Sequence, residues 1–168
     1  EFVKHYKESG SDARAIVVNT SSLWAVEPAA SFGWYSSTKS AVEMFMEVAA
    51  EENRQNPFLR FLNYAPGPLE GEMQRTIRED PKVDPSIRSS CQSLLDRGQL
   101  VPPEVSALKC IRIAIEEAHR SGDHLDFYEQ IEGIDTQRPV PTTCCANPYC
   151  QCGPGCNCKQ CGAQCGAC

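Results

Sequence analysis

Ser22, Tyr35 and Lys39 are the residue types that together transfer a proton to a carbonyl oxygen. Tyr35 and Lys39 are four residues apart, so on a helix they share one face, and the ammonium can stabilise the tyrosine in its phenolate form. The Ser22 hydroxyl could donate a second hydrogen bond to the oxyanion that develops on the substrate. A tyrosine and a lysine at this spacing also occur by chance, as an interfacial aromatic and a solvated cation, so the assignment depends on the surrounding elements.

A second set of reactive side chains is a group of nine cysteines at the end of the chain. They are Cys144, Cys145, Cys150, Cys152, Cys156, Cys158, Cys161, Cys165 and Cys168. Their Cys-x-Cys spacing is poor for disulfides between neighbours but lets adjacent thiolates bind or bridge soft metal ions. Roughly three tetrahedral divalent ions use nine thiolates when some sulfurs bridge two ions. We therefore predict a site for zinc, cadmium or copper(I); a disulfide-linked segment and an artefactual fusion remain alternatives.

Three regular elements are predicted around the first set of residues. Residues 16–18 form an apolar, β-branched run typical of a buried parallel strand, which delivers Ser22 at its carboxyl end. Tyr35 opens a helix that must end before Pro57. Residues 60–65 predict a second strand, so the catalytic candidates lie in a strand–helix–strand unit.

The alternation continues further along the chain. Residues 69–97 predict one or two short helices, Pro102 and Pro103 open another helix, and residues 124–128 predict a short final strand. The apolar stripe expected on the helix after Pro103 comprises Val105, Leu108, Ile111, Ile115 and Ala118. This order predicts an α/β fold with a parallel sheet, equivalent to the carboxyl-terminal half of a Rossmann-like doubly wound sheet, with one edge lacking its neighbour.

A strand, a serine, a Tyr-x-x-x-Lys helix, a strand and a Pro-Gly pair, in that order, resemble the carboxyl-terminal half of the short-chain dehydrogenase/reductase family. Asn19–Leu23, Asn63–Leu69 and Asp126–Tyr128 are similar to its pterin-reducing branch. The resemblance implies NADPH-dependent carbonyl reduction in tetrahydrobiopterin synthesis, with Ser22, Tyr35 and Lys39 as catalytic residues and Ser22 and Tyr35 contacting the substrate. The cofactor-binding residues that it implies are Tyr35, Lys39, Pro66, Gly67, Pro68, Leu69, Met73 and Gln74.

Asp126 is the residue expected to recognise the substrate. A pterin presents an amino group and a ring N–H side by side, and one carboxylate can accept hydrogen bonds from both. An exposed charge at the end of a strand is the alternative interpretation of Asp126.

The resemblance also implies a homodimer that pairs through the helix after Tyr35. The broad apolar face of that helix comprises Ala41, Val42, Met44, Phe45, Met46, Val48 and Ala49. A helix buried on all sides in the core would explain the same pattern.

The glycine-rich turn that holds the cofactor pyrophosphate in this family does not occur in the 168 residues. The chain opens in what reads as the last turns of a helix. We therefore expect a partial reductase domain in residues 1–129, inactive as it stands, and a linker in residues 130–143. Residues 144–168 are expected to be an irregular, metal-dependent segment, since residues 150–161 resemble a metallothionein domain.

Composition narrows the class of protein. The net charge of −6 and the absence of a basic stripe argue against nucleic-acid binding. No apolar run approaches the roughly 18–20 residues of a membrane span, and we expect a cytoplasmic protein. Cys91 and Cys110 are expected to be packing or surface thiols, and His5, His119 and His124 to be surface residues.

Three functions are compatible with these patterns. The first is a reductase that works with pterins or other small carbonyl compounds. The second is a metal-buffering protein with a vestigial reductase part. The third is a non-catalytic partner that pairs through the helix after Tyr35.

Overall fold

The computed structural model describes residues 1–10, 13–116 and 119–131, which all fall within one compact unit, Glu1–Ile134. The predicted Cys-rich segment, 144–168, and the predicted linker beyond residue 131 lie outside the described residues. The elements, in chain order, are α1 (Phe2–Glu8), β1 (Ala15–Thr20), the short 3₁₀ helix η1 (Leu23–Ala25), α2 (Gly33–Glu52), β2 (Leu59–Ala65), α3 (Glu72–Glu79), α4 (Pro85–Asp96), α5 (Pro103–Ile115) and β3 (His124–Asp126).

The three strands form a parallel sheet in the order β1-β2-β3. Ala15 pairs with Leu59 at the start of β1, and Ala65 pairs with Asp126 at the end of β2. The predicted α/β fold with a parallel sheet is confirmed. In the part of the chain that the structure describes, β1 is an edge strand, which agrees with the prediction that one edge of the sheet lacks a neighbouring strand.

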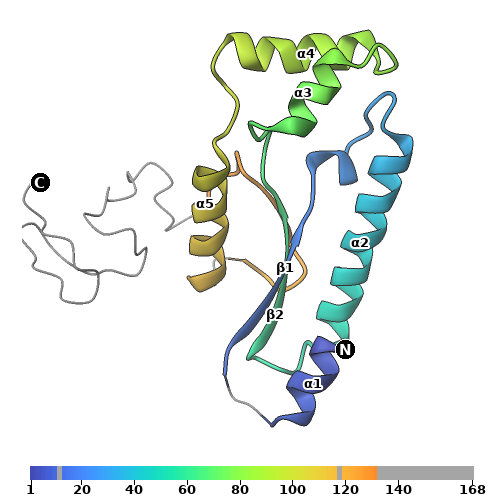
Figure 1. Cartoon of the computed structure of the whole chain (residues 1–168). Coiled ribbons are helices and arrows are strands. Elements are labelled where there is room, and N and C mark those ends of the chain that lie inside the picture. Colours follow the sequence, from blue (N-terminus) through green and yellow to red (C-terminus); the bar gives the residue numbers. More distant parts are fainter. Residues whose placement is uncertain (11–12, 117–118, 132–168) are drawn as a thin grey trace, which may run out of the picture. The chain divides into compact units, whose positions relative to one another are not determined.

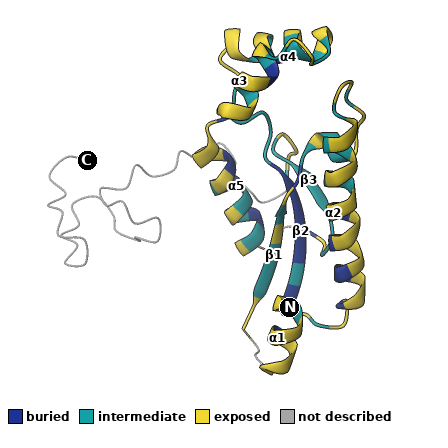
Figure 2. Cartoon of the chain, turned by 45° about the vertical axis from the view of Figure 1, so that its right-hand side comes forward, coloured by how far each residue is buried: buried dark blue, intermediate teal, exposed yellow. Residues whose placement is uncertain are grey.

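The central strand β2 is buried along most of its length, as Figure 2 shows. Its alternate side chains belong to two different hydrophobic clusters. Leu59 and Phe61 pack in a cluster with Met46 and other residues of α2. Leu62 and Tyr64 pack in a second cluster with Ile113 of α5. The strands therefore lie between α2 and α5, as Figure 1 shows.

Helix α2 has two different faces rather than one broad apolar face. Met46 and Ala49 are buried against the sheet, whereas Phe45 is 71% exposed and Val48 is 48% exposed. Helix periodicity separates these pairs, because successive residues are about 100° apart around the axis. Figure 2 shows the outer side of α2 as exposed, so the alternative of a fully buried core helix is wrong within this unit.

Helix α5 buries a different face from the one predicted. Val105, Ile111 and Ile115 are exposed, and the buried residues are Ser106, Lys109 and Ile113. Ser106 and Lys109 face the sheet because they hydrogen-bond to groups at the strand ends, which the apolar period alone does not reveal.

Two of the three histidines are not surface residues. His119 is 8% exposed, and the His124 side chain is 17% exposed. Nδ1 of His124 is 2.7 Å from Oε1 of Glu43, so one of the two ring nitrogens has a buried polar partner. His5 is exposed, as expected.

Candidate functional site

Ser22 lies two residues beyond the carboxyl end of β1 and caps the 3₁₀ helix η1. Its Oγ accepts a hydrogen bond from the backbone N–H of Trp24 at 3.2 Å. A hydroxyl has one donor and two acceptor positions, so this capping bond leaves the Ser22 O–H able to donate. The cap fixes the oxygen while keeping the hydrogen for a ligand.

Tyr35 lies in the first turn of α2 and is half-buried among aromatic rings. Its ring makes edge contacts with Trp24 at 6.1 Å and with Phe32 at 6.0 Å between centroids. Trp24 and Phe32 also contact each other, at 4.3 Å. These contacts fix the plane of the phenol and place an aromatic surface beside it.

Lys39 connects the tyrosine helix to the strand that leads to Ser22. Its Nζ donates a hydrogen bond to the Thr20 carbonyl oxygen at 2.8 Å and lies 5.8 Å from the centre of the Tyr35 ring. An ammonium has three donors, and the Thr20 bond uses one of them. Lys39 can therefore act on Tyr35 and on a ligand while it holds α2 to the end of β1.

The Pro66–Leu69 loop follows β2 at the same edge of the sheet. Gly67 has φ +76°, and a Cβ at this position would lie 3.2 Å from Cβ of Phe127. Ser106 of α5 donates a hydrogen bond to the Pro66 carbonyl at 2.8 Å. The loop is thus held on one side by α5 and on the other by the chain after β3.

Asp126 ends β3, beside Ala65 of β2. Its Oδ1 accepts the backbone N–H of Tyr128 at 2.9 Å. Lys109 of α5 donates hydrogen bonds to the backbone carbonyls of Phe127 and Glu129 at 2.5 and 2.6 Å. Burial lowers the pKa of Lys109, and the negative charges of Asp126 and Glu129 oppose that shift.

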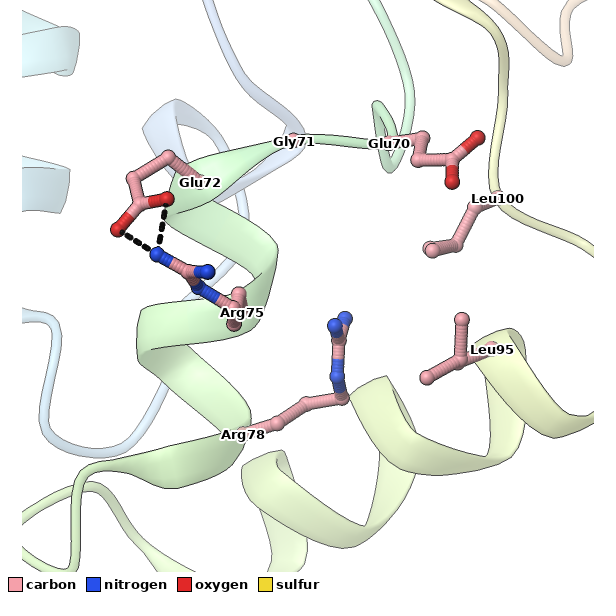
Figure 3. Close-up of a pocket in the computed structure, with 7 residues that line it drawn as sticks. All are labelled: Glu70, Gly71, Glu72, Arg75, Arg78, Leu95 and Leu100. Atoms are coloured by element: carbon pink, nitrogen blue, oxygen red, sulfur yellow. Dashed lines mark hydrogen bonds and ion pairs between the residues drawn. The ribbon is translucent and has the colours of Figure 1, made fainter.

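Met73 and Gln74 lie on α3, which packs against α4 beyond the carboxyl ends of the strands (Figure 1). A pocket lies between α3, the end of α4 and the segments next to them, and Figure 3 shows it. Its lining residues are Glu70, Gly71, Glu72, Arg75, Arg78, Leu95 and Leu100. Glu72 and Arg75 form an ion pair with each other, at 2.6 Å. This pocket contains none of the residues predicted to act on the substrate.

The structure brings the predicted residues to one edge of the sheet, because the carboxyl ends of parallel strands meet there. Ser22, Tyr35 and Lys39 lie at the end of β1, the Pro66–Leu69 loop follows β2, and Asp126 ends β3. Met73 and Gln74 lie on the separate α3–α4 pair. Sequence reasoning missed the aromatic neighbours Trp24 and Phe32.

Sequence reasoning also missed a buried polar group behind the site, formed by Ser21, Glu43 and His124. One signal was available for Glu43. It lies four residues after Lys39, on the helix face that carries Tyr35 and Lys39.

No cluster of three or more His, Cys, Asp or Glu side chains suited to a metal ion occurs among the described residues. The nine cysteines predicted as metal ligands lie outside them. No helix in the described residues is long and apolar enough to span a membrane.

The sequence of this chain is similar to those of known proteins. A family model described as short chain dehydrogenase matches residues 2–82. Sepiapterin reductase of Xenopus tropicalis is 39% identical over 118 residues, which cover 70% of this chain and 44% of the relative. The described part of the chain is short-chain dehydrogenase-like.

Two further comparisons agree with this short-chain dehydrogenase-like character. Sepiapterin reductase of Mus musculus is 42% identical over 113 residues, which cover 67% of this chain and 42% of the relative. A short chain dehydrogenase/reductase from Saccharomyces cerevisiae has a similar solved structure, with a TM-score of 0.61 and 26% identity over 68% of this chain and 46% of that one. The chain therefore spans less than half the length of the relatives that it matches.

Proposed function

We propose that this chain supplies the catalytic and substrate-recognition part of an NADPH-dependent carbonyl reductase of the sepiapterin reductase type. The observation that carries the proposal is the arrangement of Ser22, Tyr35 and Lys39 around the end of β1, with Lys39 bonded to Thr20 and adjacent to the Tyr35 ring. In this role Tyr35 gives its proton to the carbonyl oxygen of the substrate. Ser22 donates a hydrogen bond to the same oxygen, and the Lys39 charge stabilises the phenolate that remains.

The residues present fit the nicotinamide end of the cofactor. Lys39 retains donors beyond its Thr20 bond, and the backbone of Pro66–Leu69 lies at the same edge of the sheet. When bound, the reduced nicotinamide supplies the hydride. No glycine-rich turn for the pyrophosphate occurs in the 168 residues, so that end of the cofactor needs a nucleotide-binding part from outside them.

The substrate is proposed to be a pterin with a side-chain ketone or a related small carbonyl compound. The relatives named sepiapterin reductase support this choice. Asp126 would accept hydrogen bonds from the amino group and the ring N–H of the pterin, while the aromatic surface of Trp24 and Phe32 lies beside Tyr35.

The test is NADPH-dependent reduction of sepiapterin by a protein that joins these residues to the nucleotide-binding part of the mouse relative. Tyr35→Phe removes the proton donor and should lower kcat by about 10²- to 10⁴-fold. Ser22→Ala should cost less than Tyr35→Phe, because it removes one contact to the oxyanion. Ser37→Ala, an exposed change on the same helix, is the matched control. Turnover that survives Tyr35→Phe would contradict the proposal.

We also propose that α2 pairs with its copy in a homodimer. Trp34, Phe45 and Val48 lie on its outer face and are 90%, 71% and 48% exposed. In a two-fold symmetric dimer, these side chains of both copies would be buried. Burial of one large apolar side chain contributes roughly 1.5–3 kcal/mol to the free energy of association. Phe45→Glu should convert the dimer to a monomer in sedimentation experiments, whereas Ile111→Glu on α5 should not. A monomer with Ile111→Glu and a dimer with Phe45→Glu would show that the interface is on α5 rather than α2.

A second candidate function concerns the Cys-rich segment. The dense Cys-x-Cys spacing in residues 144–168 favours thiolate binding of zinc, cadmium or copper(I). In that case the protein buffers metal ions, and the short-chain dehydrogenase-like part is vestigial. Metal content and reductase activity are separate measurements, so the two candidates can be tested independently.

A further inference from the structure

A buried polar group lies behind the candidate site and joins three elements. Ser21, the first residue after β1, is 3% exposed, and Glu43 of α2 is 4% exposed. His124 opens β3 and completes the group. None of these residues is among those assigned to catalysis, cofactor binding or substrate binding above.

One carboxylate oxygen holds the group together. The Ser21 hydroxyl donates a hydrogen bond to Oε1 of Glu43, and Nδ1 of His124 lies 2.7 Å from the same Oε1. With the imidazole hydrogen on Nδ1, this contact is a hydrogen bond that Oε1 accepts, like the bond from Ser21. Glu43 is therefore a shared acceptor for one donor that follows β1 and one that opens β3.

The position of each member relates this group to the site. Glu43 lies four residues after Lys39 on the inner face of α2. Ser21 immediately precedes Ser22. His124 lies two residues before Asp126, and residues at this spacing in a strand point to the same face.

A carboxylate at this position is a costly way to join elements. Burial of a charge opposes folding unless hydrogen bonds compensate it, and an apolar side chain of similar volume usually stabilises a core at least as well. A buried acid that holds two strands to one helix thus points to control of relative position rather than to stability.

We propose that Glu43 is a positioning residue that sets the helix of Tyr35 and Lys39 relative to Ser22 and Asp126. This inference rests on the proposed function for its catalytic meaning, but the positional link itself is independent of turnover. The Ser21 bond fixes the end of β1 and the His124 bond fixes β3. Both bonds end on the same oxygen, so the end of β1 and the start of β3 move with α2.

Amide hydrogen exchange of the full chain, without cofactor or substrate, tests the link. The reporters are the Ser21 N–H, bonded to the Tyr64 carbonyl, and the Phe127 N–H, bonded to the Ala65 carbonyl, each at 2.8 Å. The reference is the Ala15 N–H at the opposite end of β1, bonded to Phe58 at 2.7 Å.

Glu43→Leu removes the acceptor and should accelerate exchange at both reporters roughly tenfold to a hundredfold relative to Ala15. Glu43→Gln keeps a carbonyl oxygen that can accept both bonds, so it should stay within about threefold of the parent chain. Glu47→Gln, an exposed change one turn further along α2, is the matched control and should leave all three amides unchanged.

Two single-arm variants decide the result if Glu43→Leu does not fold. Ser21→Ala should accelerate exchange at Ser21 but not at Phe127, and His124→Leu should do the reverse. Equal acceleration at the reporters and at Ala15 in these variants would show general destabilisation and overturn the proposal. Parent-like exchange at both reporters would overturn it as well. A failure of the proposed function would appear instead as absent turnover in the protein joined to the nucleotide-binding part of the mouse relative, with this exchange pattern intact.

Discussion

At the level of single residues, Asp126 combines an observed structural contact with a proposed role in substrate recognition. Its Oδ1 already accepts the Tyr128 N–H, so a change to alanine would disturb the turn as well as remove the charge. Asp126→Asn keeps a carbonyl oxygen for that bond and isolates the effect of the charge.

In the joined reductase, Asp126→Asn should raise KM for sepiapterin by about tenfold to a hundredfold, because hydrogen bonds to a charged group contribute roughly 1.5–3 kcal/mol. The KM for a simple diketone, which has no pterin amino group, should change little. Steady-state kinetics with both substrates measures the difference. An equal loss for both would show that Asp126 is structural.

Tyr64 gives a pH-dependent contribution to stability. Burial raises the pKa of Tyr64 to about 12, although the hydrogen bond with the Ser106 side chain lowers it in part. The charge of Asp126, and that of Cys110 where its thiol is ionised, act in the same direction as burial. The Tyr64 hydroxyl is 3.1 Å from the Ser106 carbonyl oxygen, to which it donates. Folding thus favours the neutral phenol, whose contribution is complete below about pH 10 and is lost as the pH rises toward 12.

The difference in unfolding free energy between the parent chain and Tyr64→Phe should be constant up to about pH 10. It should then fall by about 2 to 3 kcal/mol by pH 12. Urea unfolding at a series of pH values measures it, and the subtraction removes the lysines and arginines that titrate in both chains. A difference that does not vary with pH would contradict this account.

At the level of elements, the loop after β2 and the chain after β3 hold each other in place. Gly67 needs its positive φ, and Phe127 fills the space where a side chain would stand. Phe127 in turn donates its N–H to the Ala65 carbonyl at 2.8 Å. The contact joins the loop proposed to meet the nicotinamide to the strand proposed to bind the substrate.

Gly67→Ala should therefore destabilise the chain more than Gly98→Ala. Gly98 has a similar φ of +63°, but a Cβ there would meet nothing within 4 Å. The Gly98 change reports backbone strain alone, roughly 1–2 kcal/mol, and the Gly67 change adds the collision with Phe127. Thermal unfolding of both variants measures the difference, and equal losses would show that the loop moves freely away from Phe127.

At the level of the whole molecule, metal binding by the Cys-rich segment is a prediction from the sequence. The reduced chain should bind about three divalent ions, because nine thiolates suffice when some sulfurs bridge. Copper(I), which uses fewer thiolates per ion, should load to a higher number. The affinity for metal ions should decrease as the pH is lowered, because protons compete with the metal for the sulfurs.

Native mass spectrometry counts the ions directly. Replacement of Cys91 and Cys110 by alanine should leave the count unchanged, because these two cysteines belong to the short-chain dehydrogenase-like part. A reduced chain that binds no ion or only one would contradict the prediction.

The sequence by itself determined the elements and their order. The β-branched run before Ser22, the proline after the long helix and the proline pair before α5 are local signals, and local signals set where strands and helices begin and end. The same local spacing placed Tyr35 and Lys39 on one helix face. Parallel pairing of β1, β2 and β3 followed from their alternation with helices.

Only the tertiary structure decided which polar residues are buried together. Ser21, Glu43 and His124 meet across 22 and 81 residues of sequence. Ser106 and Lys109, not the apolar stripe of α5, face the sheet. Such contacts depend on how elements pack in three dimensions. A short-range sequence pattern does not indicate which distant residue will hydrogen-bond to a buried polar group. The sequence alone therefore could not predict these contacts.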